Sequence, residues 1–135
     1  MKMHVSNDQT LNGYTNLEVN SNSVANEVDN SFLEILAVDA LDKLDYENVE
    51  SFLGLLVSKL RLNGKLVLGG YDFDVIARRI LTGSIDPKEV NHVIGNSKSV
   101  IGIHALLELL TKRFKLSIDS AIVKGYKYEI TAVRK

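Results

Sequence analysis

The sequence contains no cysteine, no tryptophan and a single proline. The lack of cysteine excludes thiol catalysis, disulfides and cysteine-ligated zinc, and it fits a reducing compartment. The three histidines, His4, His92 and His104, are far apart and show no H-x-x-x-H spacing. The sequence therefore predicts no metal site.

Long apolar runs and an excess of positive charge are also missing. No apolar run reaches the ~18–20 residues that a membrane-spanning helix needs, and residues 1–5 are too short and polar for a signal peptide. The net charge of −1 argues against a nucleic-acid-binding protein with a broad basic face. We therefore expect a cytoplasmic protein, with neither membrane nor nucleic acid as a partner.

The composition that is present is that of an ordinary globular protein. The 135 residues are 45% hydrophobic and 24% charged, which predicts one domain over residues 1–135. The part before Phe32 is rich in asparagine and serine, and its apolar residues predict short strands at 1–5 and 14–19. A disordered, asparagine-rich tail is the alternative for this part.

The central segment has the pattern of a strand–helix–strand unit. Phe32–Val38 is an almost continuous apolar run, typical of a strand buried on both faces. A helix is predicted over about 45–60, because its apolar residues fall on one stripe. After a turn at Asn63-Gly64, a second apolar strand is predicted at Lys65–Leu68, closed by Gly69-Gly70. The two strands should be parallel neighbours.

Helix start and stop signals follow. Asp72 is a candidate N-cap for a helix that stops at Gly83. Asp86-Pro87-Lys88-Glu89 has the spacing of a capping box and starts a short helix that ends near Gly95. A longer helix is predicted from about 99 to 114.

The C-terminal part alternates apolar and polar residues on either side of Lys124-Gly125. This pattern predicts an antiparallel hairpin of strands 116–123 and 126–133. Together the segments predict an α/β fold, with a mostly parallel sheet that ends in this hairpin and carries helices on its faces.

These segments resemble the Rossmann-like core of class I S-adenosylmethionine-dependent methyltransferases. FLEILAVDALDKL (32–44) and LVSKLRLNGKLVLGGYD (56–72) resemble the fourth strand, fourth helix and fifth strand of that family. Asp42 stands where the family has the Glu of its L-E-H-L motif, Lys43 replaces the His, and Asn63-Gly64 replaces a Pro-Gly-Gly turn. Segments 1–5 and 14–18 resemble the first two strands, and the terminal hairpin resembles the sixth and seventh. The resemblance implies S-adenosylmethionine as cofactor.

The resemblance also implies cofactor-binding residues at the carboxyl ends of the strands, where this kind of sheet binds ligands. The family's glycine-rich turn is here Ser6-Asn7-Asp8-Gln9, without glycine, and Asp8 brings a carboxylate toward the carboxylate of the cofactor. Backbone contacts are expected from Ser6, Asn7 and Asp8. Glu18, at the end of the second strand, is expected to accept the ribose hydroxyls.

Further site residues are expected at the ends of the two central strands. Asp39 follows the strand at 32–38 and is a candidate cofactor-facing residue. Tyr71 and Asp72 follow the next strand and are candidate substrate-side residues. For Asp72 the alternative is a helix cap alone.

Three functions are consistent with the sequence. The first is methyl transfer from S-adenosylmethionine to an unknown acceptor, either a small molecule or an exposed polymer end. The second is a non-catalytic binding or scaffolding module that kept the fold and lost the cofactor site, since a fold does not dictate a function. The third is an unrelated small α/β domain.

The N-terminal third is short for this fold. About nine residues separate Val5 from Thr15, fewer than a parallel crossover with a helix usually needs. The family's first helix should therefore be short or missing, and Asn20–Ser31 is equally tight for a further helix and strand. Because a thinly covered sheet face tends to find a partner, we expect a homo-oligomer formed through this region.

Overall fold

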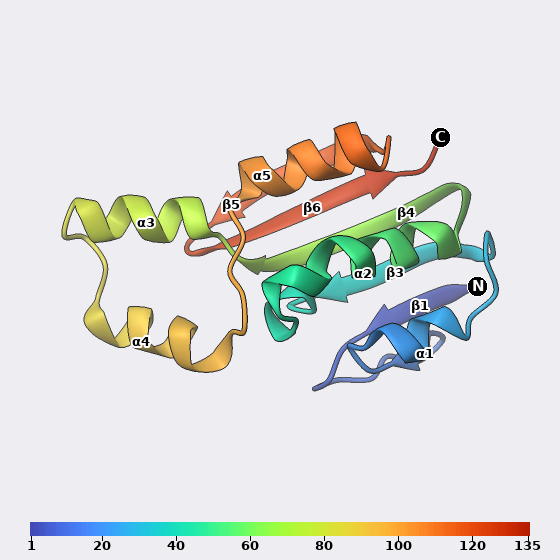
Figure 1. Cartoon of the computed structure of the whole chain (residues 1–135), viewed down its shortest axis with the longest axis horizontal. Coiled ribbons are helices and arrows are strands. Elements are labelled where there is room, and N and C mark those ends of the chain that lie inside the picture. The colour runs from blue at the N-terminus through green and yellow to red at the C-terminus, as the bar shows by residue number, and fades with distance from the viewer.

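The computed structural model describes all 135 residues as one six-stranded sheet with a layer of helices (Figure 1). The strand order is β2-β1-β3-β4-β6-β5, in which β2, β1, β3 and β4 are parallel and β6 is antiparallel to both its neighbours. This arrangement confirms the predicted mostly parallel sheet with a C-terminal antiparallel hairpin. The strands are β1 Lys2–Val5, β2 Thr15–Leu17, β3 Phe32–Val38, β4 Leu60–Tyr71, β5 Ser117–Lys124 and β6 Lys127–Val133.

The helices are α1 Ser21–Ala25, a 3-10 turn Leu41–Lys43, α2 Tyr46–Lys59, α3 Phe73–Leu81, α4 Pro87–Asn96 and α5 Ile103–Glu108, which continues as a π-helix over Leu109–Arg113. Helix α1 follows β2, helix α2 follows β3, and three further helices lie between β4 and the C-terminal hairpin. None of these helices has the length and apolar character required to cross a membrane.

The predicted parallel pair lies at the centre of the sheet. In β3 and β4, Ile35 is paired with Leu66 and Ala37 with Leu68, and all four side chains are fully buried. The apolar stripe of α2 belongs to the same core cluster, so burial against the sheet explains the periodicity of residues 45–60. The predicted bounds of α2 and β3 agree with the structure.

Several boundaries differ from the prediction. The strand expected at 14–19 is limited to Thr15–Leu17, and β4 continues through Gly69-Gly70 to Tyr71 instead of closing there. β4 begins at Leu60, so the turn expected at Asn63-Gly64 is an irregularity inside one long strand, where Asn63 has a φ of 65°. A Cβ on Gly64 would lie 2.7 Å from the carbonyl oxygen of Phe32, and only glycine allows this approach. The helix expected from residue 99 begins at Ile103. The residues before it, 97–102, form the connection from α4 to the layer of helices.

The N-terminal third is reduced, as predicted. No helix connects β1 to β2, and α1 has five residues. Asparagine side chains hold the loops together: Asn16 bonds to both backbone groups of Leu11, and Asn20 caps α1 by accepting the N–H of Ser23. The asparagine-rich segment is therefore folded onto the sheet and is not a disordered tail.

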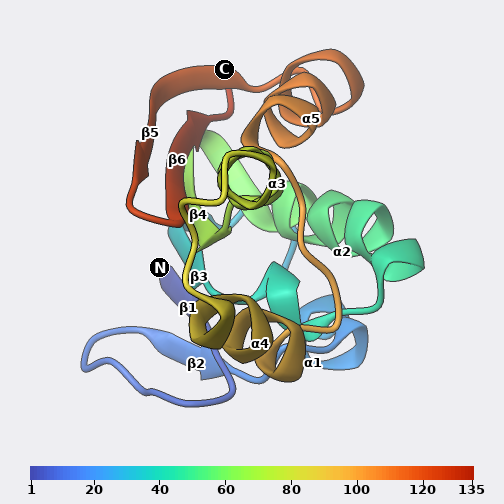
Figure 2. The same ribbon diagram turned by 90° about the vertical axis from the view of Figure 1, so that its left-hand side faces the viewer.

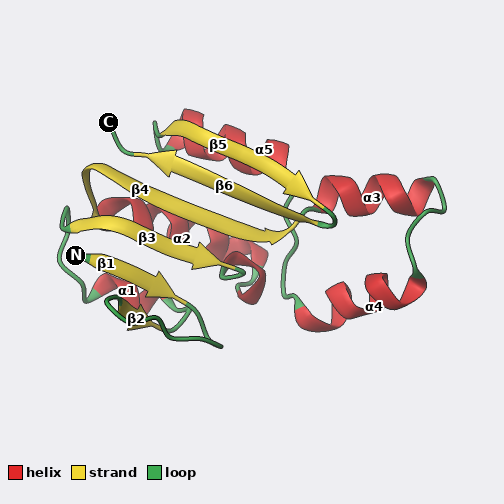
Figure 3. Ribbon diagram, turned by 180° about the vertical axis from the view of Figure 1, so that it is seen from behind, coloured by secondary structure: helices red, strands yellow, loops and turns green.

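The helices α1, α2 and α5 cover one face of the sheet only. Figure 2 shows them all on one side of the strands, and Figure 3, from behind, shows the strands with no helix in front of them. Helices α3 and α4 project beyond the carboxyl end of β4 (Figure 3). The face without helices carries alternate residues of each strand, among them Leu36, Val38, Val67 and Ile122.

Candidate functional site

Three adjoining cavities lie at the edge where the parallel strands end. Their volumes are about 100, 220 and 300 Å³. The first two share Asp8, Asp39 and Lys43, and the last two share Lys43, Asn96 and Ser97. Because Lys43 lines all three, they form one polar depression between the strand ends and α4. We call it the strand-end groove.

The structure brings together most of the predicted site residues. Ser6, Asn7, Asp8 and Asp39 line the smallest cavity, and Tyr71 lines the next. These residues come from the ends of β1, β3 and β4, as expected for an open parallel sheet.

Glu18 and Asp72 line none of the three cavities. Glu18 follows β2 and is exposed. Asp72 is buried, with its Oδ1 accepting the N–H groups of Asp74 at 3.1 Å and Ile103 at 2.9 Å. Asp72 therefore caps α3, as the alternative interpretation held, and also ties the start of α5 to it.

The turn after β1 satisfies its own hydrogen bonds. Ser6 Oγ accepts the N–H groups of Asp8 at 3.1 Å and Gln9 at 3.2 Å, while Asn7 Oδ1 accepts the N–H of Val19 at 2.8 Å. A glycine-rich turn would offer such N–H groups to a ligand. In this chain the Ser6 hydroxyl occupies two of them.

Two aspartates, Asp39 and Asp42, follow β3 and line the groove. Asp39 has a φ of 60°, donates its N–H to the Gly69 carbonyl at 2.8 Å and accepts from Lys127 Nζ at 3.3 and 3.4 Å. Asp42 is 5% exposed and accepts the N–H of Tyr71 at 3.3 Å. A Cβ on Gly70 would lie 2.9 Å from Oδ1 of Asp42, so glycine at this position makes room for the carboxylate.

Burial raises the pKa of Asp42 to about 6, and the negative charge of Asp39 adds to the rise. The N–H of Tyr71 and the lysines Lys127 and Lys43 act in the opposite direction. The Asp42 carboxyl therefore changes charge close to neutral pH. Burial also raises the pKa of Tyr128, and the nearby Asp42 adds to that shift.

Several groove residues were not among the predicted site residues. Asp42 and Lys43 were noted only as counterparts of the L-E-H-L motif, although that match is a signal that would have found them. Lys127 is 88 residues from its partner Asp39, and His92 and Asn96 come from α4. No sequence spacing relates these residues, because the strand order brings them together. No group of three or more histidine, aspartate or glutamate side chains is arranged to hold a metal ion.

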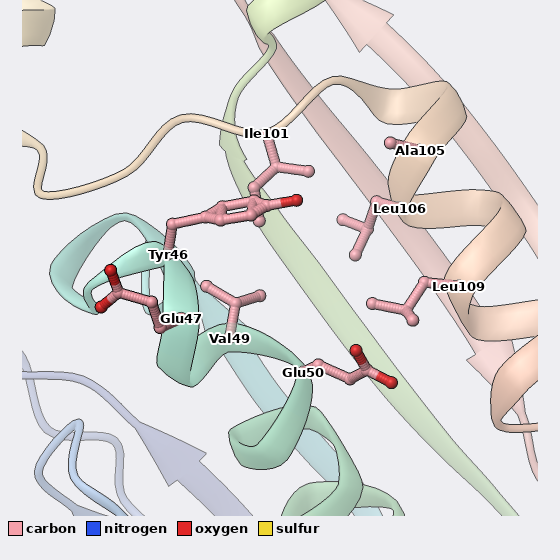
Figure 4. Close-up of a pocket in the computed structure, with 8 residues that line it drawn as sticks. All are labelled: Tyr46, Glu47, Val49, Glu50, Ile101, Ala105, Leu106 and Leu109. Carbon is pink, nitrogen blue, oxygen red and sulfur yellow. The ribbon is translucent and has the colours of Figure 1, made fainter.

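A separate cavity of about 290 Å³ lies between α2 and the segment of α5 (Figure 4). Its walls are mostly apolar, including Val49, Leu106 and Leu109, and Tyr46 and Glu47 lie at its rim. None of the predicted site residues lines it. The cavity belongs to the helical layer and lies apart from the strand ends.

No protein-family model matches the sequence. No curated protein matches it either.

Solved structures do match. They include a protein from Pyrococcus horikoshii OT3 (15% identity, TM-score 0.62, covering 91% of this chain and 60% of that one). Magnesium protoporphyrin IX methyltransferase from Synechocystis PCC 6803, with bound SAH, matches at 13% identity and TM-score 0.58, covering 92% and 53%. A SAM-dependent methyltransferase from Methanosarcina mazei matches at 17% identity and TM-score 0.61, covering 95% and 70%.

These matches span nearly all of this chain but only part of the other proteins; the chain covers 60% and 53% of the first two. Identities this low establish the fold alone. The chain has the Rossmann-like fold of class I S-adenosylmethionine-dependent methyltransferases, with a reduced N-terminal third.

Proposed function

We propose that the chain binds S-adenosylmethionine in the strand-end groove and acts as a methyltransferase on an acceptor still to be identified. The observation that carries the proposal is the position and charge of the groove. It lies at the carboxyl ends of β1, β3 and β4, where this fold binds ligands, and it presents carboxylates and ammonium groups side by side.

The charges of the groove fit this cofactor. S-adenosylmethionine carries a cationic sulfonium, an ammonium and a carboxylate, and Asp8, Asp39 and Asp42 line the cavities together with Lys43 and Lys127. Asp39 and Asp42 complement the two cationic groups, because opposite charges attract strongly in a partly desolvated site, whereas Asp8 opposes the cofactor's carboxylate. Since Ser6 occupies the N–H groups of the turn, Lys43 is the better partner for the carboxylate.

The chemistry that S-adenosylmethionine supplies when bound is an activated methyl group. The chain's own residues bind and orient it, and much of the rate enhancement in such a transfer comes from aligning donor and acceptor. On the acceptor side, Asp42 and His92 both line the part of the groove with a volume of about 220 Å³. The raised pKa of Asp42 suits a group that accepts a proton near neutral pH.

Calorimetric titration tests the proposal. We expect S-adenosylmethionine to bind more tightly than S-adenosylhomocysteine, because the latter lacks the sulfonium charge that the aspartates complement. Ligand at 100 times its Kd should also stabilise the fold by about 2.7 kcal/mol, visible as a rise in melting temperature.

A pair of variants locates the binding site. Asp39→Asn should weaken S-adenosylmethionine binding about tenfold, corresponding to the ~1.4 kcal/mol of one charge-assisted contact. Asp119→Asn removes an exposed acid from β5, outside the groove, and should leave binding unchanged. Equal effects of the two variants would argue against the groove as the site.

A second candidate function is a non-catalytic methyltransferase-fold module that binds or scaffolds other molecules. The specific observation in its favour is the self-satisfied turn, in which Ser6 takes the N–H groups of Asp8 and Gln9. The same titration separates the two candidates, because no binding of either ligand at millimolar concentration supports this second function. Recovery of binding in a Ser6→Gly, Asp8→Gly double variant would show that the turn alone had been lost.

A further inference from the structure

The uncovered face of the sheet is an unusual surface for parallel strands. Parallel sheets occur almost only with both faces covered, yet α1, α2 and α5 all lie on the same side (Figures 2 and 3). Apolar side chains lie on the other side: Val38 is 43% exposed and Ile122 is 56% exposed, and Leu36 and Val67 are half-buried between them. We call this surface the bare face.

The pairing of β3 with β4 gives the bare face a specific pattern. Across these two strands Glu34 is paired with Lys65, Leu36 with Val67, and Val38 with Gly69. Each pair places both residues on the same side of the sheet. The centre of the bare face therefore carries an acid beside a base, two apolar side chains beside each other, and a valine beside a glycine.

This pattern is complementary to itself. A two-fold axis that runs along the strand direction, between β3 and β4, places each residue of a pair opposite the other residue in a second copy. Glu34 then faces Lys65 of the second copy, Leu36 faces Val67, and Val38 faces the space above Gly69. Such reciprocity is what a two-fold interface requires.

Lys65 is exposed, whereas Glu34 is half-buried beside Tyr14 and keeps one carboxylate oxygen, Oε2, for a second partner. Lys65 forms no ion pair within the chain, and Glu34 accepts one hydrogen bond, from the Tyr14 hydroxyl at 3.0 Å. A cavity of about 260 Å³ lies beside Gly69, lined by Val38, Ile122 and Glu129 among others. It offers room for an apolar side chain of a second copy.

The area is sufficient for a dimer of modest affinity. The strands β3, β4, β6 and β5, about 4.8 Å apart and paired over six or seven residues, present roughly 450 Å², so two copies would bury roughly 900 Å² along these strands. Weak, reversible protein contacts have areas of this size. We propose that the bare face is the contact between two copies of this chain, packed sheet on sheet about an axis between β3 and β4.

The charge pairs provide a test that separates contact between copies from a general structural effect. Lys65→Glu should dissociate the dimer, because two acids would face each other, and Glu34→Lys should do the same with two lysines. An equimolar mixture of the two variants restores both opposite-charge contacts. We expect a monomer of about 15.0 kDa for each variant alone and a heterodimer of twice that mass in the mixture, by light scattering and native mass spectrometry.

Two further variants complete the design. Val67→Lys places a charge at the apolar centre of the bare face and should give a monomer. When it is added to both Lys65→Glu and Glu34→Lys, the equimolar mixture of those variants should also stay monomeric. Lys88→Glu makes the same charge change as Lys65→Glu on the exposed first turn of α4 and should leave the dimer intact. Far-ultraviolet circular dichroism checks that each variant is folded.

Either of two outcomes overturns the proposal. One is a wild-type chain that stays monomeric up to about 100 µM, above the micromolar range expected of an interface this small. The other is a dimer that Lys65→Glu and Glu34→Lys each form as tightly as the wild type, since the contact would then lie on another surface.

Discussion

At the scale of single residues, Asp42 shows how packing sets chemistry. Its carboxyl is 5% exposed and lies against Gly70, with one backbone N–H as hydrogen-bond donor. Because the donor and the nearby lysines only partly offset the cost of burying a charge, the pKa is raised to about 6 from 3.8. Any side chain at position 70 would collide with the Asp42 carboxylate, because a Cβ there would lie 2.9 Å from its Oδ1.

The pKa shift of Asp42 predicts how stability depends on pH. The folded pKa is higher than the unfolded one, so the folded state binds more protons between about pH 3.8 and pH 6. The contribution of the Asp42 carboxyl to the free energy of unfolding is therefore fully present below pH 3.8 and is lost as pH rises through about 6. Asp42→Asn removes the buried charge and should stabilise the protein at pH 7 by on the order of 2 kcal/mol, measured by urea unfolding.

The difference between Asp42→Asn and the wild type should shrink as pH falls from 6 and disappear below about pH 3, where the wild-type carboxyl is protonated in both the folded and the unfolded state. Asp119→Asn, on the exposed strand β5, is the matched control and should show no such pH dependence. A stabilisation by Asp42→Asn that is equally large at pH 4 and pH 7 would contradict the raised pKa.

At the scale of elements, Asp72 connects two helices that are far apart in the sequence. Its Oδ1 caps α3 through the N–H of Asp74 and binds the N–H of Ile103 at the start of α5. Gly102 provides the N-cap of α5 and makes no side-chain capping bond of its own. One buried carboxylate thus fixes the direction in which the chain enters and leaves the α3–α4 excursion.

Two capping aspartates allow a direct comparison. Asp72→Ala should cost about 2–3 kcal/mol of unfolding free energy, because it leaves two N–H groups near the core without a partner. Asp86→Ala removes one exposed bond, from the N–H of Lys88 at 2.9 Å, and should cost about 0.5–1 kcal/mol. Chemical denaturation measures both. Equal losses would mean that Asp72 acts as a cap alone.

At the scale of the whole molecule, the one-sided helical layer links stability to concentration. If two copies pack on their bare faces, association stabilises the folded state by mass action. The melting temperature of the wild type should therefore rise with protein concentration. That of Val67→Lys should stay constant, as measured by differential scanning calorimetry over a hundredfold range.

A flat concentration dependence for the wild type would agree with a monomer and contradict the proposed contact. High salt should lower the wild-type melting temperature at high concentration only, since salt screens the Glu34–Lys65 contacts between copies. The cavity beside Gly69 shares Asp39 and Lys127 with the strand-end groove, so the cofactor titration is carried out on the monomeric Val67→Lys variant as well as on the wild type.

Local patterns predicted much of the fold. The apolar run at 32–38, the stripe at about 45–60 and the alternation around Gly125 each determine an element through short-range periodicity and turn chemistry. The elements β3, α2 and the hairpin appear within about one residue of the prediction, with the hairpin turn at Gly125-Tyr126 instead of Lys124-Gly125. The extent of β4 was not predictable in this way. Its first residues are held by distant contacts, such as the N–H of Asn63 on the Arg134 carbonyl.

For the candidate site, the sequence by itself determined which residues stand at strand ends: Ser6, Asn7, Asp8, Asp39 and Tyr71 line the groove because their positions follow directly from the strands. Only the tertiary structure decided that Asp72 binds the start of α5, that Lys127 meets Asp39, and that one sheet face is bare. The physical reason is that strand ends follow from local patterns, whereas strand order and the placement of helices over a face depend on how the whole chain buries its apolar surface.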